Sequence, residues 1–539
     1  MIRWLIIIIS VTLLSACQLV ASINPVVTDD RAYADAKVVD DLSSEQLPSI
    51  DAEIIAADNL DTAPVTAALI LTAQQEADLW VRIQRQLSFI APEHQRLVAQ
   101  RNWYLRNPAY MERVAKRAAP FMYMIVEEIE RRQMPLELAL LPIVESAFDP
   151  FAYSHGRAAG IWQFIPGTAR NYGLEINWWY DGRRDVLAST HAALDYLEAL
   201  HKRFDGDWLH ALAAYNSGEG RVEGAIRANA RAGKATDFWA LDLPRETRAY
   251  VPKLLALADI LKHHERYQYS WTPIDNQPYL AVVEVASQID LATAAEHAGL
   301  SLKQLHHYNS GYNRWATDPQ GPHRLLLPIA NAQQLQQWLA SAERSEFVQW
   351  TRHQVKSGES LLVIAKHYHT TVEAIRAANE LRGNLIRAGD YLLIPVATRD
   401  LAEYSLSADQ RLAATQATNR DNFKIEHQVV AGDTLWDISR KYEVNLRSLA
   451  SWNGMAPTDP LRPGKKLVVW LPQQQAAGAV MRSIQYQVRS GDSLARIAER
   501  FNVTIADIEK WNQINRRKHL QPGQRLKLYV DVTRINSQS

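Results

Sequence analysis

One unit of roughly 45 to 50 residues occurs three times in the C-terminal part of the chain, and this repetition constrains the fold more than any other feature. Each copy begins with a short β-type run and a glycine-containing motif, and an asparagine follows that glycine by 21 residues. The motifs and asparagines are Gly358-Glu359-Ser360-Leu361 with Asn379, Gly432-Asp433-Thr434-Leu435 with Asn453, and Gly491-Asp492-Ser493-Leu494 with Asn512. A second glycine and a second β-type run close each copy, and Ser360, Thr434 and Ser493 are suited to cap a helix. The sequence therefore predicts three strand–helix–helix–strand units.

This pattern resembles the LysM module, a family that binds glycans containing N-acetylglucosamine, such as peptidoglycan and chitin. The resemblance assigns modules to residues 350–396, 425–471 and 484–530, and a packing module without a ligand is the alternative. Apolar residues between Leu291 and Asn309 keep the register of the second copy at a constant offset of 144, although Gln288 replaces the motif's glycine. Our hypothesis for residues 266–345 is a linker region with a degenerate, structural LysM-like module.

The start of the chain has the pattern of an export signal. Arg3 supplies a positive charge, and Leu5 to Leu14 form an apolar stretch too short to span a bilayer comfortably. Leu14-Ser15-Ala16-Cys17 resembles a bacterial lipobox, in which the signal is cut before a cysteine that carries acyl chains, and Cys17 is the only cysteine of 539 residues. Several acyl chains anchor a protein stably without a spanning helix. We predict a signal peptide at 1–17 with lipidation of Cys17; a plain signal peptide is the alternative.

The residue after the cysteine bears on location. By resemblance to Gram-negative lipoproteins, an aspartate there would favour the inner membrane, so Gln18 points to the outer membrane, facing the periplasm. Residues 18–75 show little periodicity, and the stretch from Asp29 to Asp61 has ten acidic and two basic residues. This composition predicts a disordered tether. The whole chain has 59 Lys plus Arg and 59 Asp plus Glu, so no global electrostatic footprint for nucleic acid exists.

Residues 76–265 show helical periodicity. Apolar residues recur at intervals of three and four, for example at Leu79, Ile83, Leu87 and Ile90, and no convincing run of alternating strand residues appears. A segment of this length can bury its own core. We therefore predict a compact, mostly α domain.

The segment from Pro135 to Asp149 contains the most informative carboxylate. Proline suits a helix start and Asp149-Pro150 a helix end, so Leu138, Leu141 and Glu145 are expected on one helical face. A glutamate on an apolar face is unusual, because an unpaired buried carboxylate is costly. Burial favours the protonated form of a carboxyl group, which can then act as a general acid. A solvated glutamate at a frayed helix end is the alternative.

Four motifs in this region occur in a fixed order. They are Glu145-Ser146, Gly160 to Ala169 (GIWQFIPGTA), Ala213 to Gly218 (AAYNSG) and Glu246 to Val251 (ETRAYV). Their spacing resembles the soluble-lytic-transglycosylase-like family, a goose-lysozyme-like α fold, over roughly residues 110–265. The expected fold is thus multidomain: a mostly α, lysozyme-like catalytic domain at 76–265 followed by small βααβ LysM modules.

The resemblance implies a role for each matching residue. Glu145 matches the family's single catalytic acid and base, and Tyr250 matches a tyrosine that supports the site beside it. The implied substrate-binding residues are Ser154, Gln163, Phe164, Tyr215, Asn216 and Tyr250. One departure is Arg157, where the family usually has a glycine, so the loop that carries Ser154 is expected to differ.

The resemblance also implies a reaction. The family cleaves the β-1,4 bond between N-acetylmuramic acid and N-acetylglucosamine without water, which gives 1,6-anhydromuramic ends. Glu145 would protonate the glycosidic oxygen and, as a carboxylate, then accept the proton of the sugar's C6 hydroxyl. No cofactor or metal is implied, and the implied partners are peptidoglycan strands and, through the lipid anchor, the membrane.

Two alternatives to this reaction stay open. A muramidase would hydrolyse the same bond and would need a second carboxylate, about 5 Å or about 6.5–9.5 Å from the first. Asp149, Asp181 and Asp185 are the candidates, although Asp149 suits a helix stop and the other two suit ion pairs with Arg183 or Arg184. The second alternative is a non-catalytic LysM lipoprotein that only binds peptidoglycan. The adjacent pairs His263-His264 and His306-His307 are expected to be surface or cap residues rather than metal ligands.

Overall fold

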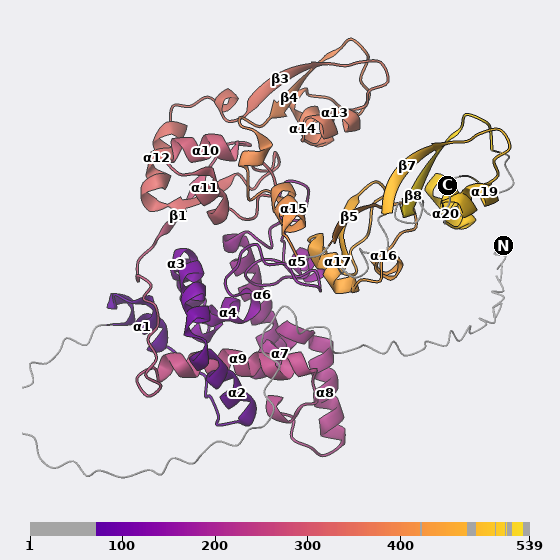
Figure 1. The fold of residues 1–539 in the computed structure, drawn as a ribbon. Coiled ribbons are helices and arrows are strands. Elements are labelled where there is room, and N and C mark those ends of the chain that lie inside the picture. Colours follow the sequence, from indigo (N-terminus) through magenta and orange to yellow (C-terminus); the bar gives the residue numbers. More distant parts are fainter. Residues whose placement is uncertain are drawn as a thin grey trace, which may run out of the picture. The chain divides into compact units, whose positions relative to one another are not determined.

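The computed structural model describes residues 72–420, 423–471, 481–501, 503–512, 514 and 520–531. The predicted signal peptide, Cys17 and the tether up to residue 71 lie outside the described residues. The described chain forms a helical domain, residues 79–262, and then four βααβ units (Figure 1). No helix in these residues combines the length and apolar character needed to cross a membrane.

The helical domain has no strand longer than an isolated bridge, as the periodicity predicts. A short 3-10 turn, Ala73–Gln75, precedes it. Its helices are α1 (Leu79–Gln84), α2 (Gln95–Arg106), α3 (Pro108–Arg131), α4 (Leu141–Ser146), α5 (Pro166–Asn171), α6 (Val186–Arg203), α7 (Trp208–Ser217), α8 (Glu219–Arg231) and α9 (Arg245–Lys262), with 3-10 turns at Leu136–Leu140 and Phe238–Ala240.

The core of this domain gathers around α3 and α9. The inner face of α3 buries Met122, Ile125, Val126 and Ile129 at the spacing of one helical face. Helix α9 is buried on nearly all sides and packs against α2, α4 and α7. Each fully buried aliphatic side chain contributes about 1.5–3 kcal/mol to folding, so this packing fixes the positions of α4, α7 and α9 relative to one another.

The single helix expected from Pro135 to Asp149 is wrong in its extent. Residues Leu136–Leu140 form a 3-10 turn, and α4 begins at Leu141 with Pro142 in its first turn. Proline is tolerated there because the first N–H groups of a helix have no intrahelical partner. Helix α4 already ends at Ser146, because Ala147 and Phe148 adopt φ values of 51° and 55° and turn the chain away.

A first βααβ unit follows the helical domain, and we call it the junction unit. It consists of β1 (Leu280–Glu284), α10 (Leu291–His297), α11 (Leu302–Tyr308), β2 (Arg324–Pro328) and the added helix α12 (Ile329–Leu339). Strands β1 and β2 pair antiparallel, with Val282 opposite Leu326. One expectation fails here, because His306 is buried rather than at the surface: its Nε2 lies 2.7 Å from the carbonyl oxygen of Tyr312, and burial lowers its pKa to about 4.

The three repeats have the predicted order of elements. The first contains β3 (Gln349–Gln354), α13 (Leu361–His367), α14 (Val372–Ala378) and β4 (Tyr391–Val396); the second contains β5 (Phe423–Gln428), α16 (Leu435–Lys441), α17 (Leu446–Trp452) and β6 (Lys466–Leu471); the third contains β7 (Met481–Gln487), α19 (Leu494–Arg500), α20 (Ile505–Asn512) and β8 (Arg525–Asp531). Helix α15 (Ala408–Ala417) and 3-10 turns at Arg344–Glu346 and Leu401–Glu403 lie between units. Ser360, Thr434 and Ser493 cap the first helix of each repeat, as expected.

The repeated asparagine joins the second helix to the closing strand. In the second repeat, Asn453 Nδ2 donates to the carbonyl oxygens of Leu449 and Val468, and its Oδ1 accepts from Val468 N. Asn379, Asn512 and, in the junction unit, Asn309 make the same three hydrogen bonds at their own positions. In each unit, the asparagine amide thus makes the pair of hydrogen bonds with the closing strand that a neighbouring strand would otherwise make.

The junction unit and the helical domain share side chains across their boundary. Tyr308 and Leu326 of the junction unit belong to the core of the helical domain. In return, Trp179 and Tyr180 belong to the core of the junction unit, where their rings lie 5.5 Å from those of Trp315 and Tyr312. The helical domain and the junction unit therefore each contribute side chains to the other's hydrophobic core.

Candidate active site

The carboxylate of Glu145 lies in the last turn of α4 and is half-buried. The phenol of Tyr250, from α9, donates a hydrogen bond to its Oε1. Tyr250 itself is buried, and this burial together with the neighbouring Glu145 raises the pKa of its phenol well above the usual value. The phenol therefore stays protonated and remains a hydrogen-bond donor to the glutamate across the physiological range.

The main chain at residues 161 and 162 is held from two sides of Glu145. Ser146, next to the glutamate, donates from Oγ to the carbonyl oxygen of Ile161 at 3.0 Å. Tyr215 of α7 donates from its phenol to the carbonyl oxygen of Trp162 at 2.9 Å. The Trp162 ring is buried, and its Nε1 donates to Thr190 Oγ1. These contacts fix the loop that contains residues 161 and 162 relative to Glu145.

That loop, residues 153–164, is a compact turn, and we call it the substrate loop after the sugar-binding role expected for Ser154 and Gln163. Isolated bridges join Tyr153 to Ala159 and Ala159 to Phe164. The Ser154 hydroxyl accepts a hydrogen bond from the Ala158 N–H, and Gln163 donates from Nε2 to the Gly160 carbonyl at 2.8 Å. The substrate loop therefore presents Ser154 and Gln163 on a backbone that is closed by its own hydrogen bonds.

Arg157 stands in this loop where a glycine is usual in the resembling family, and its backbone explains the preference. Its φ is 67°, in the left-handed region that glycine occupies without strain. Arg157 adopts this conformation and directs its side chain to Asp459 of the second repeat, with Nε 2.7 Å from Oδ1. The difference in loop shape expected at this position stays a prediction.

The two remaining predicted residues, Asn216 and Phe164, lie in different surroundings. Asn216 lies at the end of α7, and its Oδ1 accepts a hydrogen bond from Thr247 Oγ1 of α9 at 2.8 Å. The Phe164 ring, by contrast, is buried at 3% exposure and lies 6.3 Å from the Tyr215 ring. We therefore read Phe164 as a packing residue, in place of the expected sugar contact, because its ring has almost no exposed face.

The acidic residues considered for hydrolysis are engaged elsewhere. Asp149 accepts a hydrogen bond from the Phe151 N–H, which closes the turn after α4. Asp181 forms ion pairs with Arg183 and Arg184, as expected. For Asp185 the expected partner is wrong: it caps α6 and pairs with Arg324 of the junction unit at 2.8 Å. That partner is 139 residues away in sequence, so local spacing could not reveal it.

Sequence reasoning missed three residues that hold the site together. Ser146 and Thr247 stand inside the quoted motifs, but the resemblance implies no role for either, and the local spacing predicts only an ion-pair role for Arg183. Among the residues that the structure describes, no group of three or more His, Cys, Asp or Glu side chains is placed to hold a metal ion.

The fold and site define a class: a helical, lysozyme-like domain with a glutamate held by a buried tyrosine, followed by small βααβ modules. Family models agree with it. The model described as "Transglycosylase SLT domain" matches residues 122–238, "Lytic transglycosylase MltD, LysM-like domain" matches 279–344, and "LysM domain" matches 353–395, 427–470 and 486–528.

Relatives define the family more narrowly. The membrane-bound lytic murein transglycosylase D of Escherichia coli is 42% identical over 407 residues, which cover 74% of this chain and 86% of that protein. A putative tributyltin chloride resistance protein of an Alteromonas species is 42% identical over 34% of this chain and 85% of its own length. The chain belongs to the membrane-bound lytic murein transglycosylase D family. It is a peptidoglycan lytic transglycosylase associated with the cell envelope.

Solved structures of lytic transglycosylases are more distant. An inactive mutant of Slt from Pseudomonas aeruginosa is 22% identical, covers 36% of this chain and 33% of its own, and has a TM-score of 0.23. The 70 kDa soluble lytic transglycosylase of Escherichia coli is 19% identical over 36% of this chain and 35% of its own, with a TM-score of 0.22. We base the family assignment on the sequence relatives and the family models.

Proposed function

We propose that Glu145 is the acid and then the base of the transglycosylase reaction. The observation that carries this proposal is the hydrogen bond from the buried Tyr250 phenol to the half-buried Glu145 carboxylate. This bond fixes the orientation of the carboxyl group at the end of α4. A positioned carboxyl group is what general acid–base catalysis of glycoside cleavage requires.

The reaction then proceeds in two proton transfers. Glu145 gives its proton to the glycosidic oxygen while the bond from that oxygen to C1 of N-acetylmuramic acid breaks. The 2-acetamido group of the same sugar supports the positive charge that develops at C1. The C6 hydroxyl oxygen attacks C1 and its proton passes to the Glu145 carboxylate. The glutamate is regenerated, no water is consumed, and the new end is a 1,6-anhydro sugar.

The residues around Glu145 have separate tasks in this proposal. Ser154 and Gln163 of the substrate loop and Asn216 of α7 bind the sugar, and Tyr250 orients Glu145. Tyr215, which the resemblance places at the sugar, is here proposed to act through its hydrogen bond to the Trp162 carbonyl, which holds the substrate loop beside the glutamate. Burial and the nearby Glu145 raise the pKa of the Tyr215 phenol, so this bond does not weaken by ionisation.

Substitution of the glutamate tests this assignment directly. Glu145→Gln keeps the shape of the side chain but cannot carry the proton, and we expect the rate of peptidoglycan cleavage to fall about 10²- to 10⁴-fold. Glu112→Gln is the matched control, because Glu112 lies on the exposed side of α3 and its carboxylate pairs with the exposed Lys116 one turn along the same helix. Full activity of Glu145→Gln would refute the assignment.

We further propose that the protein is a lipid-anchored lipoprotein of the outer membrane. The lipobox ending at Cys17 supports the anchor, and Gln18 supports the outer membrane. In this organisation a tether at 18–75 carries a catalytic domain at 76–265, a linker region at 266–345 and LysM modules at 350–396, 425–471 and 484–530. Cys17→Ser is expected to release the protein from membranes, and Gln18→Asp to move it to the inner membrane; membrane fractionation distinguishes these outcomes. Unchanged fractionation of Cys17→Ser would refute the anchor.

A further inference from the structure

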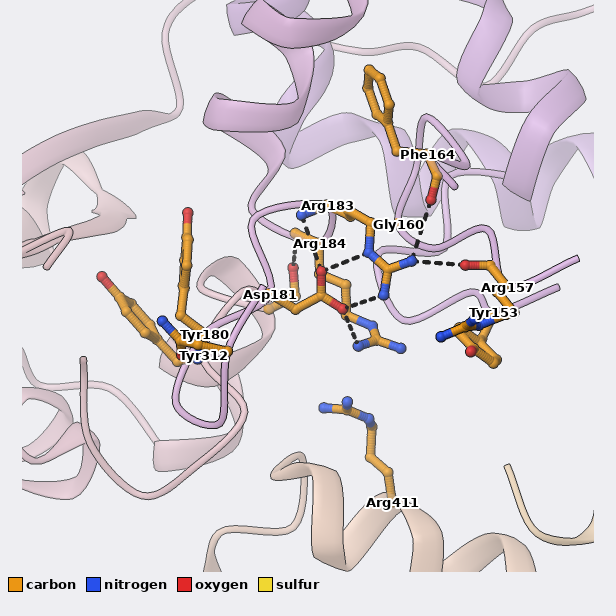
Figure 2. Close-up of polar contacts among 12 residues, drawn as sticks. Tyr153, Arg157, Gly160, Phe164, Tyr180, Asp181, Arg183, Arg184, Tyr312 and Arg411 are labelled. Carbon is orange, nitrogen blue, oxygen red and sulfur yellow. Dashed lines mark hydrogen bonds and ion pairs between the residues drawn. The ribbon is translucent and has the colours of Figure 1, made fainter. Parts of the chain in front are cut away.

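A buried ion pair lies directly behind the substrate loop. Arg183 and Asp181 are only 5% and 3% exposed. Their side chains meet through two parallel contacts, Nε to Oδ1 and Nη2 to Oδ2, both at 2.8 Å. Bidentate pairing of this kind fixes the plane of the guanidinium as well as its position (Figure 2).

The third nitrogen of this guanidinium holds the substrate loop. Arg183 Nη1 donates to the carbonyl oxygen of Arg157 at 2.7 Å and lies 3.4 Å from the carbonyl oxygen of Phe164. These two carbonyl groups stand at the tip and at the end of the loop. One side chain thus fixes both, and Figure 2 shows Arg183 between Asp181 and the loop.

The main chain of Arg183 also contacts the substrate loop, at Gly160. Gly160 has a φ of 79°, and a Cβ atom built on it would lie 1.8 Å from the carbonyl oxygen of Arg183. No side chain fits in that space, so the loop rests on the Arg183 main chain. A displacement of Arg183 must therefore displace Gly160, and with it the Gly160 carbonyl that orients Gln163.

The junction unit holds Asp181 and its neighbours from the opposite side. The Asp181 N–H donates to the carbonyl oxygen of Gly311 at 2.8 Å, and Ser310 Oγ donates to the carbonyl oxygen of Arg184 at 2.6 Å. Arg184 also pairs with Asp181 through Nη1 at 2.9 Å. A continuous set of buried contacts therefore runs from the junction unit to the substrate loop.

We propose that Arg183, held by Asp181 and the junction unit, is a positioning residue that fixes the substrate loop against the Glu145 site. This proposal rests on the proposed function, since it assumes that the loop presents Ser154 and Gln163 to the sugar. Arg183 does not touch the substrate; it acts through the two loop carbonyl groups. Misplacement of substrate-positioning groups by about 1 Å can cost about 10²-fold in rate, so loss of this contact is expected to act mainly on kcat.

The test compares substitutions of two buried arginines in the full-length protein. Arg183→Lys keeps a positive charge beside Asp181. A lysine ammonium is not planar, however, so it cannot bond Asp181 and both loop carbonyl groups at once. We expect its kcat on soluble muropeptide strands to fall between about 10- and 100-fold, with KM changed less. Arg82→Lys is the matched control: Arg82 is also buried, and its partners Glu127, Glu130 and Asn276 lie outside the substrate loop. Its kcat is expected to stay unchanged below its Tm.

Chemical rescue separates positioning from general destabilisation. For Arg183→Ala, millimolar guanidinium is expected to restore part of kcat, and methylammonium is not, because only the planar ion can replace the fork between Asp181 and the loop. An unchanged kcat in Arg183→Lys, or an equal fall of kcat in Arg82→Lys, would overturn the proposal. Glu145→Gln is measured in the same assay: full activity there would refute the role of Glu145, whatever Arg183 does. If Arg183→Ala does not fold, Arg183→Lys still decides.

Discussion

The junction unit and the three repeats have one fold but different surroundings. All four place two short helices between two antiparallel strands, and all four use the same asparagine contact. In the repeats, apolar side chains near the start of the first helix are exposed, such as Leu362 at 71% and Trp436 at 59%. In the junction unit, the corresponding helix α10 is capped by Asp290, which has no exposed surface.

The hydrogen-bond partners of Asp290 explain why it is buried. Its carboxylate accepts hydrogen bonds from the Tyr404 phenol and from the Thr398 N–H, both in the segment that follows the first repeat. At the position equivalent to Asp290, the second repeat has Thr434, whose hydroxyl bonds to Asp437 of its own helix. The acid of the repeat's motif also stays within the repeat and bonds to the first strand, as Asp433 does with His427 and Asp492 with Tyr486. The same small fold is therefore covered by neighbouring segments in the junction unit, whereas the start of its first helix is open in the repeats.

Removal of the second and third repeats gives the largest expected effect on binding. A chain that ends at residue 420 keeps α15 and the contacts of Asp290. Loss of multivalency is expected to weaken binding to intact sacculi by about 10²-fold or more. Cleavage of soluble muropeptides is expected to change little, because the substrate loop loses its contacts with Asp459 but keeps the bond from Arg183. Co-sedimentation with sacculi and a muropeptide assay measure the two effects. Equal loss of both would show that the repeats belong to the catalytic scaffold.

Matched asparagine substitutions sharpen the comparison. Asn309→Ala and Asn453→Ala each remove three buried hydrogen bonds and leave main-chain groups unpaired, at a cost of about 1–3 kcal/mol for each buried group. Asn309→Ala is expected to lower muropeptide cleavage as well as stability. Asn453→Ala is expected to unfold only the second repeat and to lower only sacculus binding. Hydrogen exchange with mass spectrometry locates the unfolding; the opposite pattern would contradict the assignment of the two roles.

Acidification gives the smallest expected effect and distinguishes the repeats from one another. Burial lowers the pKa of His427, even though Asp433 opposes this shift. As the pH falls through the ordinary histidine value of about 6.5, the unfolded repeat takes up a proton that the folded repeat resists, so its stability falls. The third repeat has Tyr486 at this position and is expected to keep its stability over the same interval.

The substitution His427→Tyr tests the source of this pH dependence, because it gives the second repeat the residue of the third. Hydrogen exchange of the second repeat at pH 7 and pH 5 should show faster exchange at the lower pH, and His427→Tyr should remove the difference. An equal response in the second and third repeats would show that His427 is not its source.

The sequence predicted the features whose signals are local or repeated. The three repeats, their helix caps and the mostly α domain follow from spacing alone, and the resemblance named Glu145 and Tyr250. Their hydrogen bond joins residues 105 positions apart, so only the packing of α9 against α4 reveals it. The early end of α4 depends on left-handed residues at Ala147 and Phe148, which carry no glycine signal. The burial of His306 depends on the non-local fold of the junction unit.

Digestion of purified peptidoglycan in heavy-oxygen water tests the central claim most directly. The account predicts 1,6-anhydro ends without incorporated label, formed by the unsubstituted protein and by Arg82→Lys, and nearly absent with Glu145→Gln. Mass spectrometry distinguishes these products, because a hydrolysed end is heavier by one labelled water. Labelled reducing ends would contradict the account, since they would require a water nucleophile and a second carboxylate such as Asp149.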